Sequence, residues 1–144
     1  MGHIEKTETL AAGPQEIWKV ISDPSTWSDW FTIHERWMVE PPARLTSGAN
    51  LTAKIFMLGM ANKIEWVVDA VDEGSSLVLS GTGMAGVKAK FSFLLTPEGD
   101  GTQVNLAGDF EGSIIKGALG KAVEKDASKQ VQASLDKLEA LAGA

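Results

Sequence analysis

The chain has 144 residues, of which 44% are hydrophobic, and this length is enough for one domain with a sizeable buried core. Its formal net charge is −6 and it has no Lys/Arg cluster, which argues against a nucleic-acid partner, because binding to the phosphate backbone needs a concentrated basic surface. Cysteine is absent, so disulfides, thiol nucleophiles and thiolate metal sites are excluded as well. We expect a single domain over residues 1–144.

The sequence contains no membrane-spanning or targeting signal. No stretch approaches the ~20 apolar residues that a transmembrane helix requires. The N-terminus has no basic flank followed by an apolar run, as a secretory signal would have. We therefore expect a cytoplasmic protein without a membrane span.

The first predicted strand covers residues 4–10. Alternation along this strand places Lys6 and Glu8 on the same face as Ile4 and Leu10. Burying such a charged pair is costly unless it is paired or hydrated. The strand is therefore expected at an edge of the sheet or along a polar space.

Two short helices are predicted after this strand. Pro14 opens the first at a first-turn position, where its missing N–H is harmless, and Asp23-Pro24 ends it. Ser25 is the expected N-cap of the second helix, residues 26–31, which carries two tryptophans.

The strand predicted over residues 33–40 has two possible inner faces. One carries Trp37 and Val39, and the other carries His34 with a neighbouring Arg and Met. We favour the face of Trp37 and Val39 as the buried one, because it removes more apolar area from water. His34 is then expected at the rim, near the beginning of the strand.

The region from residue 51 to residue 110 predicts an antiparallel meander with one apolar and one polar face. A turn at residues 59–62 would pair Met57 with Ile64 and Leu51 with Ala70. The polar face is interrupted by Phe56 and Val67. The residues expected on the apolar inner face are Leu51, Ala53, Ile55, Met57, Ile64, Trp66, Val68, Ala70, Leu77, Leu79, Gly81, Val87, Ala89, Phe91, Phe93, Leu95, Val104, Leu106, Gly108 and Phe110.

Residues 113–142 predict one amphipathic helix of roughly 40 Å, long enough to cross a small domain. Its first two turns are rich in glycine, including Gly117 and Gly120. These small residues allow close packing on the sheet, loosen the start of the helix, or leave a hollow beneath it. The expected apolar stripe consists of Ile115, Ala118/Leu119, Ala122/Val123, Ala127, Val131, Leu135, Leu138 and Leu141.

The order of these elements carries a resemblance to a known family. Together with the segment Ala12-Gly-Pro-Gln-Glu-Ile-Trp18, the Ser22-Asp-Pro24 sequence and Trp27, it resembles the SRPBCC (START-like, helix-grip) superfamily and its polyketide-cyclase-related members. The resemblance implies an α+β helix-grip fold: a curved seven-stranded antiparallel sheet around a long C-terminal helix, with two short helices between strands 1 and 2.

Three shorter segments, residues 32–37, 59–66 and 81–90, are similar to an actinobacterial subgroup of that superfamily. One member of the subgroup is known as the toxin of a toxin–antitoxin pair. The matching segments contain no constellation of residues typical of a nuclease.

The superfamily resemblance implies a hydrophobic cavity between the sheet and the long helix, used to bind lipids, polyketides or similar molecules. The predicted inner face is compatible with such a cavity, and also with a solid core that the same side chains fill. The candidate ligand-binding residues are Trp37, Ile55, Met57, Trp66, Leu79, Phe91, Phe93, Phe110, Ile115, Leu119 and Val123. The hairpins around Met60 and Met84 are the candidate entrance, although methionines also serve as gap-fillers.

Catalysis has less support in the sequence than binding. His34 is the only candidate proton shuttle, and adjacent Glu35 points to the opposite face of a strand, so the two would not form a dyad. No nucleophile elbow, phosphate-binding loop or His/carboxylate metal cluster is present, and Gly81–Gly86 lacks the following helix of a dinucleotide site. We expect neither a metal nor a cofactor.

The sequence leaves three candidate functions. The first is binding of a hydrophobic small molecule in the cavity. The second is a toxin-like or other protein–protein interaction module, with a protein partner or a homodimer contacting the Phe56/Val67 patch or the helix. The third, which rests on analogy, is a polyketide cyclase or dehydratase that uses His34.

Overall fold

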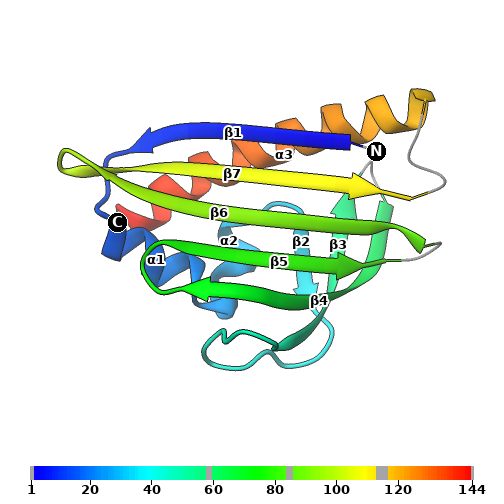
Figure 1. Ribbon diagram of the computed structural model, residues 1–144, viewed down its shortest axis with the longest axis horizontal. Helices are drawn as coiled ribbons and strands as arrows, with labels where there is room; N and C mark the ends of the chain where they lie inside the picture. The colour runs from blue at the N-terminus through cyan, green and yellow to red at the C-terminus, as the bar shows by residue number, and fades with distance from the viewer. Residues whose placement is uncertain (1, 58–59, 84–85, 113–116, 144) are drawn as a thin grey trace.

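The computed structural model describes residues 2–57, 60–83, 86–112 and 117–143. Seven antiparallel strands form one curved sheet in the order β1-β7-β6-β5-β4-β3-β2, and the long helix α3 runs behind it (Figure 1). The elements are β1 (Gly2–Leu10), α1 (Pro14–Ile21), the 3₁₀ turn η1 (Pro24–Thr26), α2 (Trp27–Trp30), β2 (His34–Trp37), β3 (Asn50–Met57), β4 (Met60–Asp72), β5 (Ser76–Thr82), β6 (Lys88–Glu98), β7 (Gly101–Glu111) and α3 (Gly117–Ala142). The α+β helix-grip architecture predicted from the sequence is confirmed.

The first strand pairs with the last one. β1 is an edge strand, as predicted, and its single neighbour in the described sheet is β7, with Gly2 opposite Phe110 and Leu10 opposite Thr102. The Glu8 carboxylate faces α3, where it accepts a hydrogen bond of 2.8 Å from Gln132 Nε2. The shared inner face of β1 is therefore partly polar, and it is covered by α3.

Two further hydrogen bonds attach α3 to β1 and to the residue that follows it. The backbone N–H of His3 donates to Glu124 Oε2 at 3.1 Å, and that of Ala11 donates to Glu139 Oε2 at 3.2 Å. Since Glu124 and Glu139 lie about four turns apart, β1 is held along most of the length of α3.

The inner faces of β5, β6 and β7 are as predicted, and the β3–β4 register is not. Met57 lies opposite Met60 instead of Ile64, and Leu51 lies opposite Trp66 instead of Ala70. The predicted turn was too long, so the partners are shifted by four residues. An even shift keeps every side chain on its predicted face, because side chains alternate with period two.

Two β-bulges move other side chains away from their predicted faces. In β4 the register shifts between Val68 and Ala70, so Ala70 is exposed, contrary to prediction, and Val71 packs on the core. In β2 it shifts between His34 and Arg36. The extra residue of a bulge breaks the alternation of faces at that point.

The predicted inner face of residues 33–40 is wrong at His34 and at Val39. His34 is buried, with 4% exposure, instead of lying at the rim, and it shares the interior with half-buried Trp37. Val39, expected inside, lies beyond the end of β2 and is 60% exposed. The sequence pattern contained no sign of the inserted residue.

The second short helix begins differently from the prediction. A 3₁₀ turn over Pro24–Thr26 precedes α2, and the cap is Asp23, whose Oδ1 accepts a hydrogen bond of 3.0 Å from the N–H of Ser25. Ser25 is therefore not the N-cap. Asp23 caps the 3₁₀ turn, and the N-cap residue of α2 is Thr26, whose side chain makes no capping hydrogen bond.

Over the described part of α3, the buried stripe includes Gly120 in place of the predicted Leu119. Gly120 is buried and Leu119 is 42% exposed, because Gly120 is in line with Val123 and Ala127 at helical spacing. Leu141 is also exposed, as are Ala118 and Ala122. Residues 113–116, which include Ile115, lie outside the described residues. Within the described chain, α1, α2 and α3 all lack an apolar stretch that could cross a membrane.

Candidate functional site

The concave side of the sheet is filled by aromatic side chains from α2 and β6. Because α2 is one turn long and both of its tryptophans are buried, it projects its rings directly at the sheet. The ring centroids of Trp30 and Phe93 are 5.8 Å apart, and those of Phe91 and Phe31, which follows α2, are 5.5 Å apart. Both pairs meet edge to face. Such pairs contribute about 0.5–1.5 kcal/mol beyond their buried area.

Phe91 is the centre of this cluster. Its ring centroid is 5.8 Å from that of Trp66 on β4 and 5.6 Å from that of Phe110 on β7, and both pairs also meet edge to face. Two glycines make room for the rings: a Cβ on Gly81 would lie 2.7 Å from Trp66 Cε3, and a Cβ on Gly108 would lie 2.8 Å from Phe91 Cε1. The sheet therefore accommodates large rings only because these two positions lack a side chain.

Three polar atoms within this apolar interior have no hydrogen-bond partner among the described residues. They are both ring nitrogens of His34 and Nε1 of Trp66. By contrast, the indole N–H groups of Trp27 and Trp37 donate to backbone carbonyls at 2.9 and 2.8 Å. An unpaired buried polar group costs about 1–3 kcal/mol, so these atoms are features of the interior that need a partner.

Burial lowers the pKa of His34 to about 4, because the protonated ring would lose its hydration. The imidazole is therefore neutral at pH 7, with one nitrogen able to donate and the other able to accept. It packs against Trp37, with ring centroids 4.5 Å apart and the ring planes tilted by 54°. Glu35 is exposed and lies 3.9 Å from Lys54 Nζ, so it does not form a dyad with His34.

The candidate binding residues separate into groups by burial. Most of them lie on the inner side of the fold, but Leu119 is exposed. Ile115 and Met84, the latter from the candidate entrance, are outside the described residues, and the side chain of Met60 is not described. The buried ones are Trp66, Leu79, Phe91, Phe93, Phe110 and Val123, and the half-buried ones that pack on the same core are Trp37, Ile55 and Met57.

Sequence reasoning left three interior residues out of the site. Trp27, Trp30 and Phe31 are at most 1% exposed, and they contribute much of the aromatic interior. Their spacing of three and four residues is the signal that one helical face points inward. The described residues bring no three His, Asp or Glu side chains together in a metal-binding cluster.

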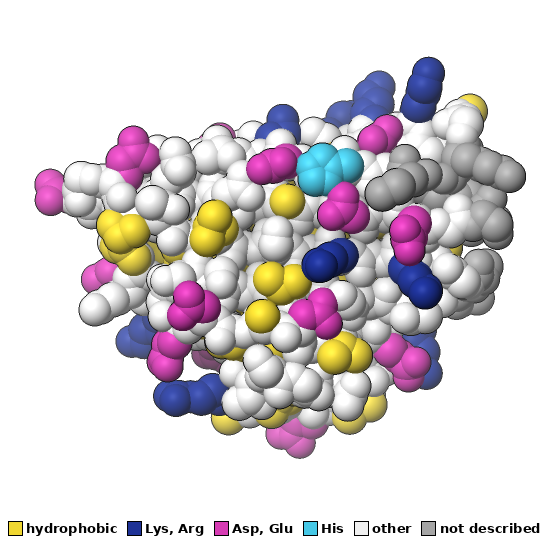
Figure 2. Space-filling view, viewed as in Figure 1, with side chains coloured by type: hydrophobic (Ala, Val, Ile, Leu, Met, Phe, Trp, Pro, Cys, Tyr) yellow, Lys and Arg dark blue, Asp and Glu magenta, His cyan; other side chains and the backbone are white. Residues whose placement is uncertain are grey.

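The outer face of the sheet differs from the inner one. Figure 2 shows acidic and basic side chains interspersed with separate apolar ones on this face. Phe56 and Val67 are 41% and 39% exposed there, but Phe56 lies opposite Ala61 and Val67 lies opposite Asn50. The two residues are therefore at opposite ends of the β3–β4 pairing and do not form the single patch predicted from the sequence. His3 lies between Asp109 and Glu5, and its hydrogen bonds, first to Asp109 and then to Glu5, raise its pKa.

Known proteins resemble this chain along nearly its whole length. Uncharacterized protein Rv1546 of Mycobacterium tuberculosis is 27% identical over 143 residues, which are 99% of this chain and 100% of the relative. Toxin Rv0910 of the same organism is 28% identical over 122 residues, 85% of each chain.

Solved structures share the fold. A START superfamily protein from Mycobacterium smegmatis superimposes with a TM-score of 0.81, covering 99% of this chain and 98% of that one at 20% identity. The sequence profile of the family described as polyketide cyclase / dehydrase and lipid transport matches residues 1–143. With the sheet, the long helix and the aromatic interior all in place, the chain belongs to this polyketide cyclase / dehydrase and lipid transport family.

Proposed function

We propose that this protein binds a hydrophobic small molecule, of the lipid or polyketide class, in the interior between the concave face of the sheet and α3. The observation that carries the proposal is the set of unpartnered polar atoms on His34 and Trp66, within a wall that is otherwise aromatic and aliphatic. Ligand sites are typically apolar with a few polar groups that fix orientation. The family to which the chain belongs supports the same class of ligand.

The chemistry of these atoms limits the polar part of the ligand. His34 is neutral and Trp66 Nε1 is a donor, and neither has a charged group as hydrogen-bond partner. A buried charged headgroup would thus lack a counter-ion, and its desolvation would cost more than one hydrogen bond returns. The ligand is therefore expected to place a carbonyl or hydroxyl group, and not a charge, in the interior.

Native mass spectrometry of the protein purified gently from its own host tests the proposal. A co-purifying hydrophobic small molecule would support it and identify the chemical class. The complementary test is a titration of purified protein with two uncharged probes, oleyl alcohol and a trihydroxyanthraquinone. A ligand-free mass from the host together with no saturable binding of either probe would overturn the proposal.

Two leucine substitutions on α3 locate the binding site. Gly120 is buried and Ala122 is exposed on the same helix. Gly120→Leu is expected to weaken binding of the probe at least tenfold, since the added side chain is on the buried side of α3. Ala122→Leu adds the same side chain toward solvent and is expected to leave binding unchanged. Equal effects of the two substitutions would argue against an interior site.

Trp66→Phe tests the polar contact itself. The substitution removes the Nε1 donor and keeps an aromatic ring in the same place. A hydrogen bond contributes about 0.5–1.5 kcal/mol, so the hydroxyanthraquinone should bind several-fold more weakly. A saturated hydrocarbon probe, which has no acceptor, should be affected less.

A second candidate function is a toxin-like protein–protein interaction module. It is favoured by the relative named Toxin Rv0910 and by the exposed Phe56 and Val67 on the outer face. Growth arrest on expression of this chain alone, relieved by Phe56→Ser, would support this function. Normal growth and the absence of any co-purifying polypeptide would exclude it.

A further inference from the structure

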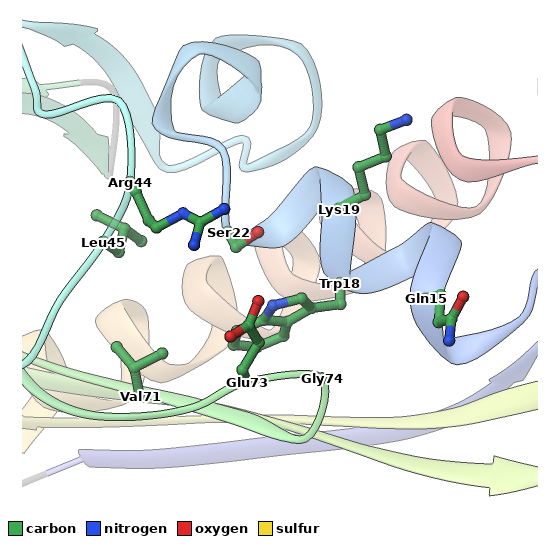
Figure 3. Close-up of a pocket in the computed structure, with 9 residues that line it drawn as sticks. All are labelled: Gln15, Trp18, Lys19, Ser22, Arg44, Leu45, Val71, Glu73 and Gly74. Atoms are coloured by element: carbon green, nitrogen blue, oxygen red, sulfur yellow. The ribbon is translucent and has the colours of Figure 1, made fainter.

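A separate pocket lies outside the aromatic interior. It has a volume of about 500 Å³ and is formed by α1, the loop that joins β2 to β3, and the turn between β4 and β5 (Figure 3). Its apolar wall includes Trp18, Leu45 and Val71. Its charged wall consists of Lys19, Arg44 and Glu73.

The unpartnered indole N–H of Trp18 is evidence that this pocket binds a ligand. It is only 8% exposed, and its indole N–H has no hydrogen-bond partner among the described residues. In Figure 3 the Trp18 ring and the Glu73 carboxylate overlap in the view, and the Arg44 guanidinium lies above and to the left of them. Three of the other tryptophans donate their indole N–H to an oxygen of the protein. A nearly buried, unpartnered donor on a residue that lines an open pocket is available to an acceptor on a bound molecule.

The charges of the pocket are also unpaired. Lys19, Arg44 and Glu73 form no ion pair with the residues that the structure describes. In Figure 3 the Arg44 guanidinium and the Glu73 carboxylate both extend toward the space over Trp18, while Lys19 extends away from them. The two charges that face this space, Arg44 and Glu73, have opposite signs, so the space offers one site for an anion and one for a hydrogen-bond donor. A carboxylate can pair with the Arg44 guanidinium, which has no ion-pair partner of its own among the described residues.

We propose that this pocket binds a small monocarboxylate with an apolar, hydroxyl-bearing body, such as a hydroxyaryl acid. The carboxylate pairs with the Arg44 guanidinium and accepts the Trp18 N–H, because a guanidinium is a strong donor to carboxylates. The apolar body covers Trp18, Leu45 and Val71, and the hydroxyl donates to Glu73. This site is independent of the interior ligand proposed above.

Titration of ¹⁵N-labelled protein with 4-hydroxyphenylacetate tests the proposal. The chain has five tryptophans, and Trp18→Phe assigns the indole signal of Trp18. That signal is expected to shift saturably, with a dissociation constant of about 1 mM or lower. The Trp66 signal reports the interior separately, so failure at one site is distinguishable from failure at the other.

Two arginine substitutions provide a matched pair. Arg44→Gln is expected to weaken binding of 4-hydroxyphenylacetate at least about tenfold, since it removes a charge-assisted hydrogen bond. Arg36→Gln, at the other arginine of the chain, which is exposed on β2, is expected to leave binding unchanged. Tyramine, which has an ammonium group in place of the carboxylate, should bind at least tenfold more weakly than 4-hydroxyphenylacetate.

Glu73→Gln separates the two polar contacts. Phenylacetate, which lacks the hydroxyl group, should bind this variant as tightly as the native protein or more tightly, because a negative charge is removed. The preference for 4-hydroxyphenylacetate over phenylacetate should fall. The proposal is overturned by an unmoved Trp18 signal up to about 10 mM probe, by equal effects of Arg44→Gln and Arg36→Gln, or by tyramine binding as tightly as the acid.

Discussion

The aromatic interior and the pocket beside α1 both contain a tryptophan whose indole N–H lacks a partner among the described residues, but their surroundings are opposite. Trp66 is 1% exposed among other rings, whereas Trp18 is 8% exposed and faces charged side chains. In the interior a polar atom is costly and a charge is excluded, so burial selects a neutral, apolar ligand. In the pocket, water hydrates the charges until an ion replaces it. The same donor thus supports different ligand chemistry in the two places.

The largest expected contrast between the two regions is in stability. Phe93 is fully buried, and Phe93→Ala is expected to lower the free energy of unfolding by about 3–5 kcal/mol in urea denaturation. Its neighbour Leu94 is 48% exposed on the outer face, and Leu94→Ala should cost less than about 1 kcal/mol. A similar loss for both variants would contradict the difference in burial between these two positions.

The second contrast is in pH dependence. Unfolded His34 takes up a proton near its ordinary pKa of 6.5, while in the folded protein it does so only near 4. The contribution of His34 to the free energy of unfolding is therefore fully present above pH 6.5, and about 3 kcal/mol of it is lost as the pH decreases toward 4. His34→Phe should remove this part of the slope in unfolding measured across that range.

His3 is the control for this pH dependence, because its pKa is raised and its side chain is exposed. Its stabilising contribution has the opposite sign: it is present at low pH and is lost as the pH rises through the folded pKa. His3→Gln should leave the acid-side slope of His34 in place. If His3→Gln removed that slope and His34→Phe did not, the acid-side pH dependence could not be attributed to buried His34.

A third prediction concerns the contact between the α2–β2 connection and α3. The backbone N–H of Thr32 donates to Ser134 Oγ at 3.0 Å, and Ser134 is fully buried. Ser134→Ala leaves this N–H unpaired and should cost about 1–3 kcal/mol in thermal or chemical unfolding. Ser128→Ala, at a half-exposed position of α3, should have little effect. Equal stability of the two variants would show that water replaces the lost acceptor.

The smallest expected effect is at the pocket beside α1. Arg44 forms no ion pair with the described residues, so Arg44→Gln should change the free energy of unfolding by less than about 0.5 kcal/mol. The same variant is expected to lose ligand affinity, which makes the pocket a site where binding and stability are separate. A large loss of stability would instead assign Arg44 a role in holding the loop.

Regular alternation explains which parts of the fold the sequence could predict. The inner faces of β5, β6 and β7 follow period two without interruption, so Leu79, Phe91 and Phe110 were placed correctly. Bulges have no signature in such a pattern, and one inserted residue reversed the expectation for His34. The expectation for Val39 failed for another reason, because β2 ends at Trp37.

The candidate site was predictable only where it lies on regular elements. Trp66 was found because it lies on a strand, but its unpaired N–H depends on every neighbouring atom and is not encoded by periodicity. The pocket beside α1 was missed because Trp18 and Arg44 come from a helix and an irregular loop. Long-range packing brings them together, and no local pattern records it.

The pairing of β1 with β7 determines how late in synthesis the sheet can close. The ribosome releases β1 first, yet its only partner in the described sheet is made about 100 residues later, and α3, which covers β1, comes last. Until then β1 has an unpaired edge, so closing the sheet requires a long loop and is expected to be slow. Translation that stops before residue 101 leaves β1 without its neighbour, and such fragments are candidates for chaperone binding and degradation.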